Sequence, residues 1–192
     1  MPSVFTRTLL SAVVAATSLG AIAAAQAPAA PAAPAAPATI TPQVRSMEVL
    51  RAFAKLCNAP QLTFDSLSAR ATATGMKVVP GQAVAGARAG RWSGAVASGD
   101  FVLLVDENRG IKGVTTSCAV AAEVGDADLF RATAIKTMSL RAGVQPDIST
   151  EGGRTFDFGI VRAPSTRITI RDFKPKGLNR VMVSVSTLTP PR

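Results

Sequence analysis

Two cysteines, Cys57 and Cys118, place the strongest constraint on how this chain of 192 residues can fold. An even number of cysteines in an exported chain favours a disulfide, and two cysteines allow a single intramolecular pairing. That bond would close a loop of roughly 60 residues, which the chain-entropy model values at about 4 kcal/mol. Free thiols or an intermolecular bond are the alternatives. We expect a structural disulfide between Cys57 and Cys118.

Export is predicted from residues 1–25, which have the three parts of a secretory signal peptide. Arg7 supplies the positive charge, residues 9–24 form an uncharged apolar stretch, and small residues precede a cleavage point before Gln26. The stretch is shorter than the about 20 residues of a membrane span. A cleavable signal is therefore favoured over an uncleaved anchor, which predicts a periplasmic or secreted protein without a transmembrane segment after cleavage.

Residues 26–39 repeat an Ala-Ala-Pro unit that has no charge and no large apolar side chain. Such a segment cannot bury a core, and its spaced prolines favour an extended polyproline II conformation. It is either a tether that holds the domain off a surface or a leader without a function. The remaining residues, 40–192, have the usual size of one domain.

Three segments have the caps and the apolar spacing of helices. Residues 41–57 have Thr41 as N-cap and Pro42 at the first helical position. Residues 63–75 and 126–143 have Thr63 and Asp126 as caps and end in glycine. The expected apolar face of the first helix consists of Val44, Met47, Leu50, Phe53, Ala54 and Cys57, with Arg45, Glu48, Arg51 and Lys55 mostly outside it.

Six further segments alternate apolar and polar residues or form short apolar runs, as strands do. They are residues 91–98, 100–107, 113–124, 154–162, 165–173 and 179–188. Cys118 lies in the third segment, so a bond to Cys57 would fix the first helix onto the sheet. We predict an α+β fold with an antiparallel sheet of about five or six strands, two or three helices packed on one face and one disulfide.

Positive charge gathers near the end of the chain. The formal net charge is +9, or +8 without the signal, and residues 154–192 hold eight basic and two acidic side chains. The candidate anion-binding residues are Arg167, Arg171, Lys174, Lys176 and Arg180. They would form a basic hairpin for an anionic envelope component. The alternatives are charges that protect a strand edge against aggregation or that keep the domain soluble.

Several chemistries are missing from the sequence. It has no histidine, no tyrosine and no GxSxG, GxGxxG or phosphate-binding-loop motif. We therefore predict no catalytic residue, no metal site and no cofactor. Nucleic acid is disfavoured as a partner, because the protein is exported and only Phe173 lies among the bases for stacking. Two carboxylate pairs, Asp106 with Glu107 and Asp126 with Asp128, leave a hydrolase as the third alternative.

The overall plan resembles small exported proteins of unknown function from Gram-negative bacteria. The resemblance rests on the signal and Ala/Pro leader, on Cys57 at the end of a helix, and on "TTSCAV" leading into "GDADLFRA", and it covers residues 44–135. It implies a location in the cell envelope and no activity, and it carries over no functional residue.

Our leading hypothesis is an exported, non-enzymatic domain that binds an anionic envelope component through the basic hairpin. The second hypothesis is an inhibitor or assembly accessory that binds another periplasmic protein through an apolar patch near Trp92.

Overall fold

A computed structural model describes residues 39–59, 62–81, 87–140, 147–148, 153–159, 166–173 and 179–191. Its helices are α1 (Pro42–Cys57), α2 (Phe64–Ala73) and α3 (Ala127–Thr137). Its strands are β1 (Lys77–Val78), β2 (Ala87–Val96), β3 (Gly99–Gly110), β4 (Gly113–Glu123), β5 (Asp147–Ile148), β6 (Arg154–Gly159), β7 (Thr166–Phe173) and β8 (Arg180–Thr189).

The strands form one sheet in the order β1-β2-β3-β4-β8-β7-β6-β5, and every neighbouring pair is antiparallel. Each half of the sheet is a meander of four strands, and the last strands of the two meanders, β4 and β8, pair at the centre. The six long strands are the six that the alternation predicts, and a two-residue strand extends each edge. The α+β class is confirmed.

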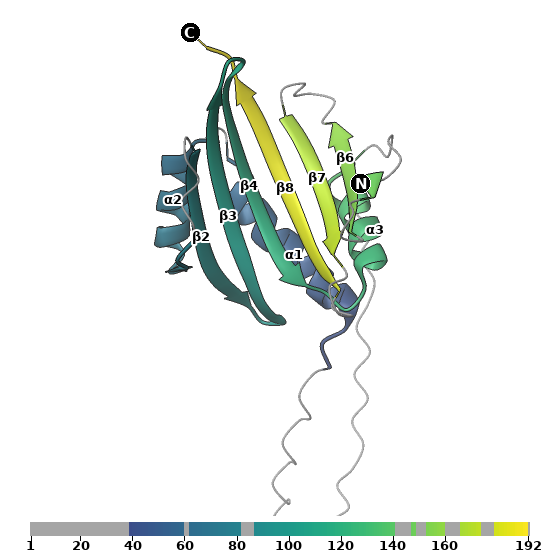
Figure 1. Cartoon of the computed structure of the whole chain (residues 1–192). Helices are drawn as coiled ribbons and strands as arrows, with labels where there is room; N and C mark the ends of the chain where they lie inside the picture. Colours follow the sequence, from purple (N-terminus) through teal and green to yellow (C-terminus); the bar gives the residue numbers. More distant parts are fainter. Residues whose placement is uncertain are drawn as a thin grey trace, which may run out of the picture. The chain divides into compact units, whose positions relative to one another are not determined.

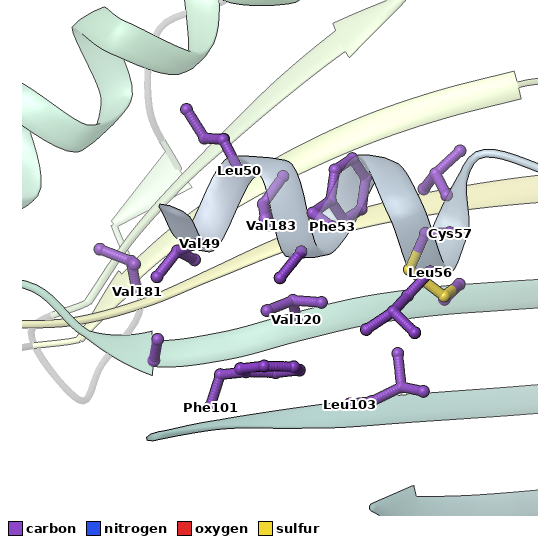
Figure 2. Close-up of a cluster of buried hydrophobic side chains, with 14 of the residues drawn as sticks. Val49, Leu50, Phe53, Leu56, Cys57, Phe101, Leu103, Val120, Val181 and Val183 are labelled. Carbon is purple, nitrogen blue, oxygen red and sulfur yellow. A yellow bond between two sulfur atoms is a disulfide. The ribbon is translucent and has the colours of Figure 1, made fainter. Parts of the chain in front are cut away.

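The three helices lie on one face of the sheet, with α1 over its central strands (Figure 1). α1 packs against β4, β8 and α3, whereas α2 contacts β2 and β3. Leu56 of α1 points toward Leu103 of β3 (Figure 2), and Val49 and Phe53 of α1 belong to the same buried cluster as Val120 of β4. All five of these side chains are buried, which places the core between α1 and the centre of the sheet.

The predicted cap of α1 is confirmed, but its predicted apolar face is partly wrong. The Thr41 hydroxyl accepts a hydrogen bond from the Val44 amide at 3.3 Å. Val44 itself is 46% exposed, and Ala54 is exposed, whereas Leu56 is buried. The buried face of α1 is the one that packs against the sheet. It is rotated around the helix axis relative to the face that the spacing of apolar residues predicts.

Arg45 is the second correction on α1, because it is buried and not on the solvent side. Its guanidinium donates to the carbonyl oxygens of Glu123 at 2.8 Å and Gly99 at 2.9 Å, and also to that of Asp100. Burial lowers the pKa of Arg45, and nearby acids, Glu48 first among them, partly offset that effect. The N-terminal end of α1 is thereby fixed to the β2–β3 turn and to the end of β4.

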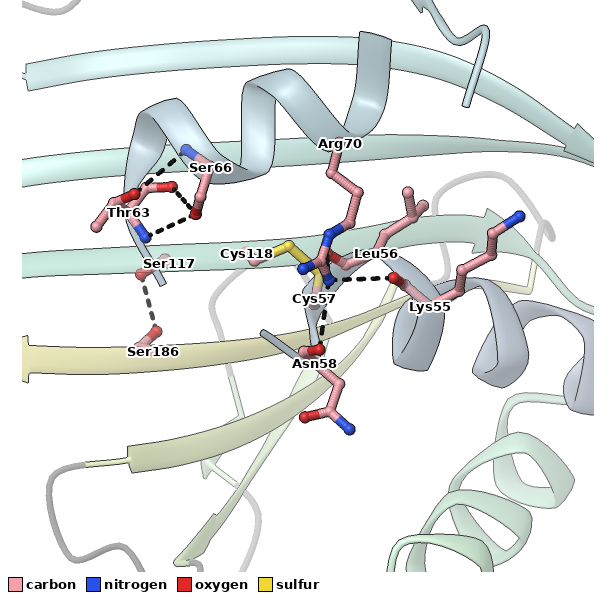
Figure 3. The surroundings of a disulfide bond; sticks show 10 residues. All are labelled: Lys55, Leu56, Cys57, Asn58, Thr63, Ser66, Arg70, Ser117, Cys118 and Ser186. Atoms are coloured by element: carbon pink, nitrogen blue, oxygen red, sulfur yellow. Dashed lines mark hydrogen bonds between the residues drawn. A yellow bond between two sulfur atoms is a disulfide. The ribbon is translucent and has the colours of Figure 1, made fainter. Parts of the chain in front are cut away.

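The disulfide between Cys57 and Cys118 is confirmed, with 5.5 Å between the two Cα atoms (Figure 3). It joins the last residue of α1 to the middle of β4. Beside it, the Arg70 guanidinium of α2 donates to the carbonyl oxygens of Lys55 and Asn58 at 3.2 and 3.3 Å. A positive charge at this end also complements the helix dipole. The C-terminal end of α1 is therefore fixed as firmly as its N-terminal end.

The third helix ends earlier than predicted. α3 stops at Thr137, because Ser139 adopts a φ of 52° and the Leu140 amide turns back to the Ile135 carbonyl at 3.0 Å. This is the hydrogen-bonding pattern of a left-handed helix end, here formed without glycine. The predicted end at Gly143 lies outside the described residues.

Candidate functional site

The predicted basic residues that the structure describes share one face of the sheet. Alternation along β7 and β8 directs Ile168, Ile170 and Val183 into the core, and it places Arg167, Arg171 and Arg180 on the opposite, helix-free face. We call these three arginines the arginine face. Lys174 and Lys176 lie outside the described residues, so their positions remain predictions.

Two members of the arginine face are paired with acids. Arg167 lies 2.9 Å from the Asp157 carboxylate of β6, and Arg180 lies 3.1 Å from the Glu123 carboxylate of β4. Arg167 is 67% exposed and Arg180 is 50% exposed. Ion pairs at such exposure contribute only about 0–1 kcal/mol, so another anion can compete for these guanidinium groups.

Arg171 differs from its neighbours, because no carboxylate of the described residues lies within ion-pair distance of it. Its Nε donates to the Thr155 hydroxyl at 3.1 Å, and its guanidinium lies 5.8 Å from the centre of the Phe173 ring. Both contacts hold the side chain along the sheet and leave its charge uncompensated. Asp172 does not reduce that charge, because it points to the opposite face.

Asp172 is buried and forms a network with Arg154 of β6. Its carboxylate accepts hydrogen bonds from the Arg154 backbone amide and from Nε, both at 2.8 Å. The hydrogen bond with Asp172 raises the pKa of Arg154. Arg154 Nη2 also lies 2.9 Å from the Asp128 carboxylate, so the network links β6 and β7 to α3. It is a structural link and leaves the arginine face untouched.

The carboxylates considered for a hydrolase do not converge. Asp106 and Glu107 are consecutive residues of β3 and point to opposite faces, Glu107 being buried near Arg88 and Arg109. Asp126 accepts the Leu129 amide at 2.9 Å as the N-cap of α3. Asp128 pairs with two arginines. Neither pair therefore presents two carboxylates on either side of a shared site.

Trp92 cannot form an exposed patch, because only 4% of it is accessible. Its ring packs on the core side of β2, 6.5 Å from the Phe64 ring centre. A side chain added at Gly90 would meet the Trp92 ring at 2.2 Å. That glycine, two residues before the tryptophan on the same face, is the sequence signal that could have revealed an inward-facing ring.

Sequence reasoning missed a cavity of about 600 Å³ on the helix-covered side of the sheet. It lies between α1, the end of α3 and strands β7 and β8. Most of its lining is apolar, and Cys57 of the disulfide forms part of its wall. No local pattern could reveal it, because its walls come from four elements that are distant in sequence.

The described residues contain no cluster of histidine, cysteine, aspartate or glutamate side chains that could hold a metal ion. Within the same part of the chain, no helix is both long and apolar enough to cross a membrane. Comparison with protein-family models, with curated proteins and with solved structures finds no match.

Proposed function

We propose that this protein is an exported, non-enzymatic binding domain that docks onto a phosphate-bearing component of the cell envelope. The arginine face and the neighbouring Lys174 and Lys176 would form the docking surface. The observation that carries the proposal is the exposed Arg171, which lies between two other arginines on the helix-free face and has no carboxylate partner among the described residues.

Arginine suits this role better than a general positive charge would. Its planar guanidinium can donate two parallel hydrogen bonds to a phosphate or carboxylate group. Arg167 and Arg171 are four positions apart on β7 and therefore lie on one face, about 13 Å apart along the strand with Thr169 between them. When one envelope phosphate binds Arg171, a second phosphate group can compete with Asp157 for Arg167, since that ion pair is exposed and weak.

The test is co-sedimentation of the purified protein with phosphatidylglycerol vesicles, with phosphatidylcholine vesicles as the neutral reference. A variant with Gln at positions 167, 171, 174 and 176 should lose most of its binding while it keeps its circular dichroism spectrum. Wild-type binding should also weaken between low and high salt, because exposed charges are screened over a Debye length of about 10 Å at 0.1 M salt.

The matched control removes the same number of positive charges elsewhere. Lys55, Lys77, Lys112 and Lys136 are exposed, and no described residue forms an ion pair with them. Replacing these four lysines with Gln should leave most of the binding intact. Equal loss in the two variants would mean that net charge alone attracts the vesicles, and the proposed docking surface would be wrong.

A second candidate function is the binding of another periplasmic protein by the same helix-free face. The strand register places Val102, Ala121 and Met182 side by side across β3, β4 and β8, with Leu104 adjacent. All four are only partly buried. Co-sedimentation with isolated cell envelope that persists at high salt and disappears in a Leu104→Asp variant would favour this function over the first.

A further inference from the structure

The cavity beside the disulfide has the size and composition of a small-molecule site. Its volume of about 600 Å³ lies within the range of about 300–1,000 Å³ for ligand pockets. Ile168 of β7 and Val185 of β8 contribute from the sheet, Leu50 and Phe53 from α1, and Met138 from the end of α3. The ligand that fits such a lining must be mainly apolar.

The cavity is also elongated along α1. Met47 and Asn58 both line it, and eleven residues of helix correspond to about 16 Å. Polar groups are few: Asn58 and the hydroxyls of Thr166 and Thr187 lie toward one end, and the Thr137 hydroxyl lies on the α3 side. A mainly apolar space of this length suits an extended hydrocarbon chain better than a compact polar metabolite.

Arg51 supplies the charge at the edge of this cavity. It lines the cavity from the exposed side of α1, and no described residue hydrogen-bonds or ion-pairs with it. Glu48, on the preceding turn, lies close enough to interact electrostatically with Arg51, but its carboxylate accepts a hydrogen bond from the Ser98 amide at 2.8 Å and forms no ion pair with Arg51. The guanidinium is therefore available to an anion that enters from solvent.

We infer that the cavity binds a single acyl chain whose anionic head group pairs with Arg51. Free long-chain carboxylates and single-chain phospholipids share this chemistry. The site lies on the helix-covered side of the sheet and uses none of the residues of the arginine face. The inference therefore does not depend on the proposed docking function, and either can fail without the other.

The experiment is a fluorescence titration of the purified protein with cis-parinarate, a fatty acid whose emission rises in an apolar site, followed by displacement with laurate. Wild type should show saturable binding. Ala54→Trp places an indole ring at an exposed helix position that lines the cavity and should abolish that binding. Ala132→Trp on α3, exposed and outside the cavity, should bind like wild type.

Arg51→Gln tests the head-group contact. It should weaken laurate binding about threefold to fivefold, as expected for a partly exposed ion pair, and leave displacement by uncharged dodecanol unchanged. Lys55→Gln, one turn further along α1 and outside this cavity, should not weaken laurate binding. Displacement by lysophosphatidylglycerol, compared with laurate, distinguishes the two head groups.

Absence of saturable cis-parinarate binding to wild type would overturn the inference, and so would undiminished binding by Ala54→Trp. Equal binding of laurate by wild type and Arg51→Gln would overturn the anionic head group. Vesicle binding by the arginine face is measured separately with substitutions on β7, so the two proposals cannot be confused.

Discussion

Replacement of Arg45 by methionine tests the contact that fixes the first end of α1. The guanidinium donates to carbonyl oxygens of Gly99, Asp100 and Glu123, which belong to the start of β3 and the end of β4. Methionine keeps an unbranched, flexible side chain of similar reach but removes every donor. Three carbonyl oxygens near the core would then lose their partner together.

The expected loss follows from this geometry. A hydrogen bond to a charged group contributes about 1.5–3 kcal/mol, and a buried acceptor without a partner costs about 1–3 kcal/mol. The carbonyl oxygens lie at strand ends, where water can replace part of the loss, and removal of the buried guanidinium recovers its desolvation cost. We therefore expect Arg45→Met to lower the free energy of unfolding by about 3–5 kcal/mol, in the range for broken buried charge networks.

The assay is urea unfolding followed by circular dichroism, with thermal unfolding in parallel. At about 2–4 °C per kcal/mol for a domain of this size, Tm should fall by roughly 10 °C. Arg51→Met is the matched control on the same helix, and it should change stability by less than about 0.5 kcal/mol because Arg51 is exposed. A loss below about 1 kcal/mol for Arg45→Met would refute the reasoning.

Three other predictions concern stability. Replacement of both Cys57 and Cys118 by alanine should lower the free energy of unfolding, measured with urea, by about 4 kcal/mol or more. If a thiol reagent labels both cysteines of the unreduced, unfolded wild-type protein, the disulfide does not form and the prediction is wrong. Hydrogen bonds from Ser98 hold the pKa of Glu48 below its usual value. The stabilisation that ionised Glu48 gives the folded protein is therefore present above the unfolded-state pKa and is lost as pH falls through the folded-state pKa. In a series of urea unfolding midpoints measured at different pH values, Glu48→Gln should reduce the fall of the midpoint at acid pH. Gly113→Ala should destabilise by roughly 1–3 kcal/mol, because Gly113 has a φ of 122° and a Cβ there would lie 2.0 Å from a β8 carbonyl oxygen; an unchanged urea midpoint would show that the hairpin can shift.

Features that depend on neighbouring residues were predictable from the sequence. Thr41, Thr63 and Asp126 act as helix caps because a short side-chain oxygen reaches an amide two or three residues on. The six long strands follow from alternation, and the disulfide follows from the count of two cysteines in a chain that is predicted to be exported. Each inference uses a local rule or a single possible pairing.

Features that depend on distant parts of the chain were not predictable in this way. The burial of Arg45 requires three carbonyl oxygens from residues that are more than fifty positions away in the sequence. The residues near position 45 form no pattern that predicts these contacts. Arg167 and Arg180 were predicted as members of a basic hairpin, but their acidic partners, Asp157 and Glu123, were not foreseen. Alternation predicts which face of the sheet a strand residue lies on, but it does not predict the register between two strands. A register shift of two residues gives the side chain different neighbours and leaves it on the same face.

The fixed ends of α1 explain how an apolar cavity can persist beside it. An empty apolar space is unfavourable, because the side chains that line it lose packing contacts, and mobile walls would close it. Here the N-terminal end of α1 is held by Arg45 and the C-terminal end by the Cys57–Cys118 bond and Arg70. The segment between them, which carries Arg51, cannot move onto β7 and β8 without breaking one of these contacts. A wall held open in advance reduces the cost of ordering the site on binding, which is what a ligand site requires.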